Sequence, residues 1–75
     1  MSRPVKHSLT LDGHRTSVTL EEPFWQAFRE IAALEGKGIN ALAAEIDAAR
    51  AGSGGIAAGL ATAIRLYVLA HYRGR

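Results

Sequence analysis

Between Val5 and Leu20, apolar and polar residues alternate along the chain, which is the pattern of strands with one buried face. Asp12-Gly13 stands in the middle of this stretch, and this dipeptide favours the two-residue type I′ turn of a β-hairpin. We therefore expect two antiparallel strands over about 5–11 and 14–20.

A two-residue turn fixes the register of this hairpin and divides its side chains between two faces. One face pairs Leu11 with His14, Leu9 with Thr16, His7 with Val18 and Val5 with Leu20. The opposite face is basic, rich in hydrogen-bond donors and without an acidic residue, and it carries Lys6, Ser8, Thr10, Arg15, Ser17 and Thr19. The first face is suited to burial and the second to solvent or a polar partner.

A helix is expected over about 22–35, directly after the hairpin. Glu21-Glu22-Pro23 marks its start, because proline fits the first helical turn and carboxylates complement the positive end of the helix dipole. Gly36 is its natural end. Apolar residues follow at helical spacing: Phe24, Trp25, Phe28, Ile31 and Ala32. We interpret the three aromatic residues as core rather than as a stacking platform for single-stranded nucleic acid.

Two further helices complete the expected order. Helical spacing of apolar residues predicts one over about 39–50, with Gly38 or Asn40 as its N-cap. The glycine-rich segment 51–55 redirects the chain, and a last helix should run over about 56–72.

The size and composition of the chain indicate self-association. It has 75 residues, of which 48% are apolar, and it has no cysteine that could supply a disulfide. A single domain of this size buries a small share of its surface, and a helix that is apolar nearly all round needs more than one neighbour. We expect one domain over 1–75 that forms a homodimer, with a dimer core of Val18, Leu20, Phe24, Phe28, Ile31, Leu42, Ile46, Leu60, Ile64, Tyr67 and Val68.

Charge and motifs exclude several classes of protein. The net charge of +2 is weak evidence for a polyanionic partner, although the basic residues gather near the two ends of the chain and residues 21–50 are net acidic. No segment has the length and apolarity of a membrane span, so we expect a cytoplasmic protein. The three histidines have no accompanying ligands at a recognised spacing, and no catalytic arrangement is evident. We expect no metal, no cofactor and no enzymatic activity.

A family resemblance rests on the strand Arg15-Thr16-Ser17-Val18-Thr19-Leu20, the proline-containing helix start and the helix-Gly-helix unit that follows. Together they resemble the ribbon-helix-helix superfamily, whose members include the Arc and methionine repressors. The likeness runs from about His7 to Tyr72. Within the superfamily, the chain resembles a bacterial subgroup of short members at these positions: Gly13-His14-Arg15-Thr16-Ser17-Val18, Leu20-Glu21, Phe24-Trp25, Ile31-Ala32, Ile46-Asp47 and Ala63-Ile64-Arg65. It implies a mainly α homodimer with a short β-ribbon and intermolecular antiparallel strand pairing. Here an N-terminal hairpin strand and an extra C-terminal helix would be added.

The resemblance also implies a function, that of a dimeric DNA-binding transcriptional regulator whose ribbon enters the major groove of double-stranded DNA. Base edges would be contacted by Arg15, Ser17 and Thr19, and an arginine can bond bidentately to guanine. Family members hold a phosphate at the N-terminus of the second helix, where free backbone N–H groups favour an anion. The phosphate contacts expected here are Lys37, Gly38, Ile39, Asn40, Lys6 and His14.

Three alternatives stay open. The strand over 5–11 either adds to the DNA-facing ribbon or blocks it. The family's second helix is either 39–50, which we favour, or 56–72, in which case the phosphate site moves to Gly59–Thr62. The dimer is either a sequence-specific repressor or a protein-interaction module or antitoxin-like partner of a second protein, without sequence-specific DNA binding.

Overall fold

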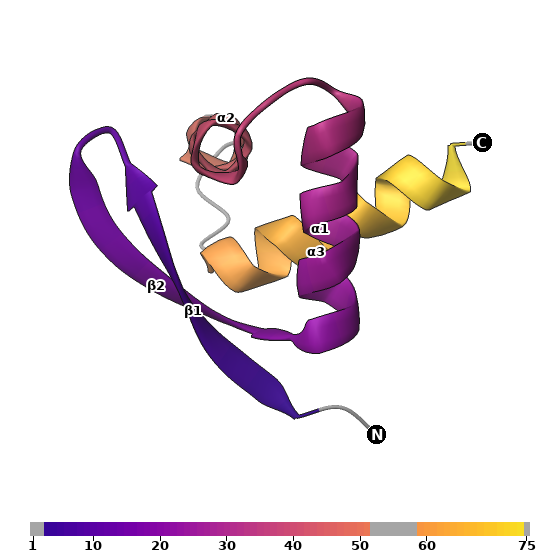
Figure 1. Cartoon of the computed structure of the whole chain (residues 1–75), viewed down its shortest axis with the longest axis horizontal. Coiled ribbons are helices and arrows are strands. Elements are labelled where there is room, and N and C mark those ends of the chain that lie inside the picture. Colours follow the sequence, from indigo (N-terminus) through magenta and orange to yellow (C-terminus); the bar gives the residue numbers. More distant parts are fainter. Residues whose placement is uncertain (1–2, 52–58, 75) are drawn as a thin grey trace.

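The computed structural model of the chain describes residues 3–51 and 59–74. Its elements are β1 (Pro4–Leu11), β2 (His14–Glu21), α1 (Glu22–Leu34), α2 (Ile39–Ala51) and α3 (Leu60–Arg73). Both strands, α1 and α2 match the expected ranges to within one or two residues. Residues 56–58 of the expected third helix lie outside the described residues. The three helices lie on one side of the hairpin, which curves past them as an arm (Figure 1).

The hairpin turns at Asp12 and Gly13, whose φ angles of 51° and 82° are both positive, as a type I′ turn requires. The register runs from Leu11 opposite His14 to Val5 opposite Leu20, as the dipeptide predicted. Every side chain of the hairpin is thereby assigned to one face, because a slip of one residue would exchange the two faces.

Helix α1 begins and ends where the sequence signals stand. Glu21 is its N-cap residue, and the proline follows in the first turn. At the other end Gly36 adopts a φ of 69°, in the left-handed region. The Gly36 N–H donates to Ala33 O (3.1 Å) and the Lys37 N–H donates to Ala32 O (2.9 Å). These two bonds form a Schellman motif, which turns the chain sharply from α1 into α2.

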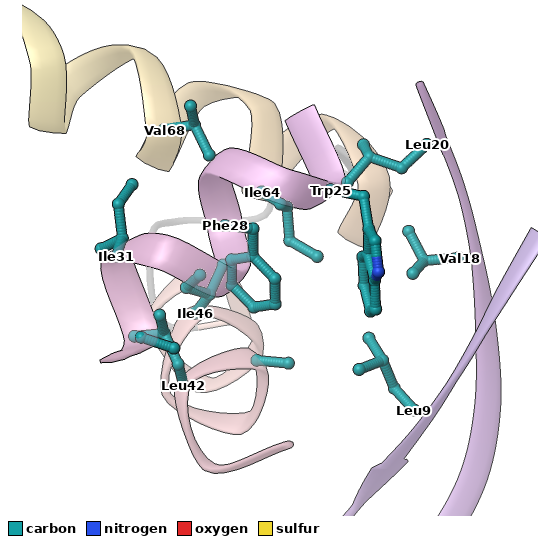
Figure 2. Close-up of a cluster of buried hydrophobic side chains, with 12 residues drawn as sticks. Leu9, Val18, Leu20, Trp25, Phe28, Ile31, Leu42, Ile46, Ile64 and Val68 are labelled. Carbon is teal, nitrogen blue, oxygen red and sulfur yellow. The ribbon is translucent and has the colours of Figure 1, made fainter. Parts of the chain in front are cut away.

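The core lies between the hairpin and the three helices (Figure 2). Phe28 of α1 is fully buried at its centre, and Trp25 fills the space between α1 and the hairpin. The interpretation of these two aromatic residues as core is confirmed. The other buried side chains come from both strands and all three helices: Leu9, Val18, Leu20, Ile31, Ala32, Leu42, Ala43, Ile46, Ile64 and Val68.

One chain fills this core without a partner. The residues expected in a dimer core are buried or partly buried here within a single copy, and Phe28, Ile31 and Ile64 have an exposed fraction of 0%. The strand β1 and the helix α3 cover apolar surface that would otherwise be exposed: β1 packs against α2, and α3 packs against both α1 and α2. The apolar core therefore gives no reason to expect a second copy, and a second copy would have to bind surfaces that the chain leaves exposed.

Candidate nucleic-acid interface

The face of the hairpin that points away from the helices is polar and entirely exposed. The register places Lys6 beside Thr19, Ser8 beside Ser17 and Thr10 beside Arg15, and all six side chains are exposed. These six include two cations and no acid. However, β2 extends one residue further than expected, to Glu21 opposite Pro4, so the expectation of a face without an acid is wrong at that end. In the part of the chain that the structure describes, the side chains of Lys6 and Arg15 have neither an ion pair nor a hydrogen bond. Both charges are therefore available to an external anion or to a hydrogen-bond acceptor.

This polar face is hollowed between the two cations. An open depression of about 410 Å³ is lined by Lys6, Ser8, Arg15, Thr16 and Ser17. The two cations stand at opposite corners of the depression, because Lys6 and Arg15 lie on different strands and on either side of the serine pair. Hydroxyl groups lie between two positive charges, which suits a ligand with several acceptor oxygens or nitrogens.

The backbone of the hairpin presents two edges with unpaired groups. The pair beside a two-residue turn exchanges hydrogen bonds and the next pair does not, so bonded and non-bonded pairs alternate along the ribbon. Hence Lys6, Ser8 and Thr10 direct their backbone groups to the outer edge of β1. There the Thr10 N–H donates to Asn40 Oδ1 at 2.9 Å, and α2 packs against this strand. The edge of β1 is thus partly covered.

The edge of β2 is more open. By the same alternation Arg15, Ser17 and Thr19 direct their N–H and C=O groups outward from it. Arg65 of α3 approaches only its end, where the guanidinium Nη2 donates to Thr19 O at 3.5 Å. The same guanidinium binds Glu21 through two hydrogen bonds of 2.8 and 3.1 Å and holds the pKa of that carboxyl below its usual value.

The first turn of α2, expected to hold phosphate, starts at one of the two expected N-cap residues and makes one contact that the sequence did not predict. Gly38 takes the N-cap position and its carbonyl accepts the first helical bond, from Leu42 N–H (3.0 Å). Ile39 is partly buried. The Asn40 side chain holds the edge of β1 at Thr10. This contact places the N-terminus of α2 next to the ribbon.

Lys37, just before α2, is already engaged by two acids. Its Nζ lies 2.8 Å from Glu45 Oε1 and 3.4 Å from Glu35 Oε1. The hydrogen bond to Glu45 raises the pKa of Lys37, with a smaller contribution from Glu35. A phosphate at this position would have to compete with two carboxylates.

The histidines take different places. His14 is exposed beside the turn. His7 stacks on the Trp25 ring with a centroid separation of 4.1 Å, and its Nε2 lies 3.0 Å from Glu22 Oε1. Within residues 3–51 and 59–74 no group of three histidine or acidic side chains could hold a metal ion. No helix in those ranges is long and apolar enough to cross a membrane.

Comparison with known protein families decides which kind of domain this is. A family model described as a ribbon-helix-helix domain matches residues 4–72. The chain belongs to the ribbon-helix-helix domain family. Such domains generally bind DNA as dimers and are typically regulatory rather than enzymatic. No curated protein and no solved structure matched the chain.

Two contributors to this interface were not foreseen. Asn40 was expected as a phosphate ligand or cap, whereas its side chain binds a strand 30 residues away. Arg65 was noted only as part of the family resemblance, and its guanidinium lies at one end of the β2 edge. Both contacts join elements distant in sequence, so no local pattern announces them. The cations and hydroxyl groups of the polar face, in contrast, were visible in the sequence.

Proposed function

We propose that this ribbon-helix-helix protein is a dimeric transcriptional regulator, a repressor, that reads the major groove of DNA in the cytoplasm. Arg15, Ser17 and Thr19 would contact base edges. The observation that carries the proposal is the polar face of the hairpin, where two unpaired cations stand among four hydroxyl side chains and the acid at its end, Glu21, is bound by Arg65. A β-ribbon fits the major groove, arginine can bond bidentately to guanine, and Ser and Thr hydroxyls bond to several bases.

A second copy would pair along the edge of β2. That edge offers the outward backbone groups of Arg15 and Ser17 without a cover, whereas Asn40 and α2 occupy the edge of β1. Antiparallel pairing of two β2 strands would place both copies of Arg15 on one continuous polar face. The N-terminus of α2 would then flank this face on either side, which supports the backbone N–H groups at Gly38, Ile39 and Asn40 as phosphate contacts. His14, exposed beside the turn, would be a further phosphate contact, and Lys37 would contribute less because of its carboxylate partners.

The test is selection of DNA from a random pool followed by affinity measurement on the selected site. Arg15→Ala should weaken binding by about 1–3 kcal/mol and relax preference at one base position in each half-site. Arg29→Ala is the matched control, because Arg29 is an exposed arginine of α1 without a partner in the described residues. It removes the same charge on the helical side. Equal affinities of wild type and Arg15→Ala would overturn the assignment of base reading.

A second function is favoured by one specific observation on α3. Leu66, Leu69 and Tyr72 lie on one side of this helix with exposed fractions of 57%, 47% and 43%. Exposed apolar stripes of this kind often mark protein contacts. The alternative is therefore a protein-interaction module or antitoxin-like partner that holds a second protein through α3. In a gel shift on random genomic fragments, retention of no fragment even at low salt would favour this module over the regulator.

A further inference from the structure

We propose that β1 is a phosphate-binding strand, so that a dimer of this protein divides the work of DNA contact between inner strands that read bases and outer strands that hold the backbone. This inference rests on the proposed function; it assigns the expected phosphate contact of Lys6 to an outer strand of the dimer and adds Ser8 as its partner. It also answers whether the additional N-terminal strand joins or blocks the DNA-facing ribbon.

The first step is the order of the strands. If two copies pair through β2, each β1 lies outermost, because β1 is hydrogen-bonded to the other edge of its own β2. The sheet then has four strands, and their polar faces form one surface. Lys6 of each copy lies next to Thr19 and therefore one strand farther from the dyad than Arg15.

The second step compares the width of this sheet with that of the groove. Neighbouring strands are about 4.8 Å apart, so the inner strands lie about 2.4 Å and the outer strands about 7.2 Å from the dyad. The major groove of B-DNA is about 12 Å wide, which leaves about 6 Å on each side of its centre. The inner strands therefore fit over the base edges, whereas the outer strands lie above the walls of the groove. Those walls are the phosphate backbones.

The third step is the chemistry of the two cations. The inner strand carries an arginine, whose planar fork suits bidentate contact with guanine, and the outer strand carries a lysine, a compact charge suited to a phosphate. Ser8 stands beside Lys6 along β1 and lines the same depression, so its hydroxyl can donate to a phosphate oxygen. The register places the Glu21 carboxylate at the end of this face, opposite Pro4, where two hydrogen bonds from the Arg65 guanidinium offset its charge.

The experiment measures binding to the selected site by fluorescence anisotropy over a series of salt concentrations, together with a panel of single-base variants of that site. Lys6→Ala removes two phosphate contacts from a dimer, so the slope of log K against log salt should become shallower by about 1.8. With an unchanged intercept at 1 M salt, affinity at 0.1 M should fall roughly 60-fold. The ranking of the single-base variants should stay as in the wild type.

Three variants serve as controls. Lys6→Arg should keep the wild-type slope and ranking, because it keeps the charge. Arg15→Lys should keep much of the slope but lose preference at its base, since a lysine lacks the bidentate fork. Arg29→Ala should change neither quantity, although it lowers the net charge by the same amount as Lys6→Ala.

The outcomes separate the two proposals. A wild-type protein without any sequence preference would overturn the proposed function, and this inference with it. If the wild type is specific but Lys6→Ala changes the ranking of base variants, the hairpin of one chain enters the groove by itself and the division of strands is wrong. An unchanged salt slope in Lys6→Ala would overturn the phosphate role alone. Lys6 is exposed and has no partner in the described residues, so its replacement should leave the fold intact, as circular dichroism can verify.

Discussion

The proposed pairing of two copies through the edge of β2 can be tested by placing proline at two matched positions of the hairpin. Ser8 and Ser17 stand opposite each other as a non-bonded pair, so each directs its backbone N–H away from its neighbour. Proline removes that N–H and its ring occupies the space of an incoming strand, yet it is tolerated on the free edge of a sheet. Ser17→Pro therefore acts on the edge of β2, and Ser8→Pro makes the same change on the edge of β1.

The expected effect on the dimer follows from the lost hydrogen bonds. Ser17→Pro removes one intermolecular N–H donor from each copy, and a hydrogen bond contributes about 0.5–1.5 kcal/mol net. The dimer should lose about 1–3 kcal/mol, which corresponds to a dissociation constant about 5- to 150-fold higher. Clash with the ring adds to this figure. Ser8→Pro should leave the constant unchanged, and neither variant breaks a bond between β1 and β2.

Sedimentation equilibrium of the wild type and the two proline variants measures the dimer dissociation constant, and urea unfolding checks that each monomer is folded. A dimer disrupted by Ser8→Pro but not by Ser17→Pro would show that β1 carries the interface. A wild type that stays monomeric at micromolar concentration would refute the pairing of β2 strands altogether.

Three further predictions concern the single chain. Asn40→Ala leaves the Thr10 N–H without its side-chain partner and should lower the free energy of unfolding by about 0.5–1.5 kcal/mol in urea titrations; no change would mean that water replaces the amide in full. Phe28→Ala empties the centre of the core and should cost about 3–5 kcal/mol, whereas Leu34→Ala, at a side chain 74% exposed, should stay within about 0.5 kcal/mol; similar losses in the two variants would contradict the core. The hydrogen bond that the Tyr67 hydroxyl of α3 donates to Glu35 lowers the pKa of this carboxyl. Its stabilisation is therefore present above the ordinary value of 4.5 and lost as the pH falls below it. Glu35→Gln should accordingly lose less stability than the wild type between about pH 5 and pH 3, and parallel pH curves would show that the bond contributes nothing.

Local signals in the sequence were sufficient for the hairpin and for α1. A turn with two positive φ angles admits few residues, so Asp12-Gly13 fixed both the turn and the register. A carboxylate-proline start and a glycine end bounded α1 in the same way, since each acts within one turn of helix. The composition of the polar face followed from the register, except for Glu21, which the expected strand end at residue 20 left out.

Packing between distant elements was beyond these signals. The sequence shows that α3 is apolar on several sides, but it does not show whether those sides meet the same chain or another one. The structure places Ile64 and Val68 in the core of the single chain and leaves Leu66 and Leu69 exposed. In the same way the two carboxylates around Lys37 meet only once α1 and α2 are folded against each other. Which cation is free is therefore a property of the tertiary structure.

The self-sufficient core separates two events that coincide in proteins whose interior is shared between subunits. A copy leaving the ribosome can reach its native state by a first-order process, at a rate that does not depend on how many other copies are present. Only the proposed joining of two β2 edges would be second-order. The abundance of the protein would then govern how much of it is competent to act on DNA without governing how much of it survives proteolysis.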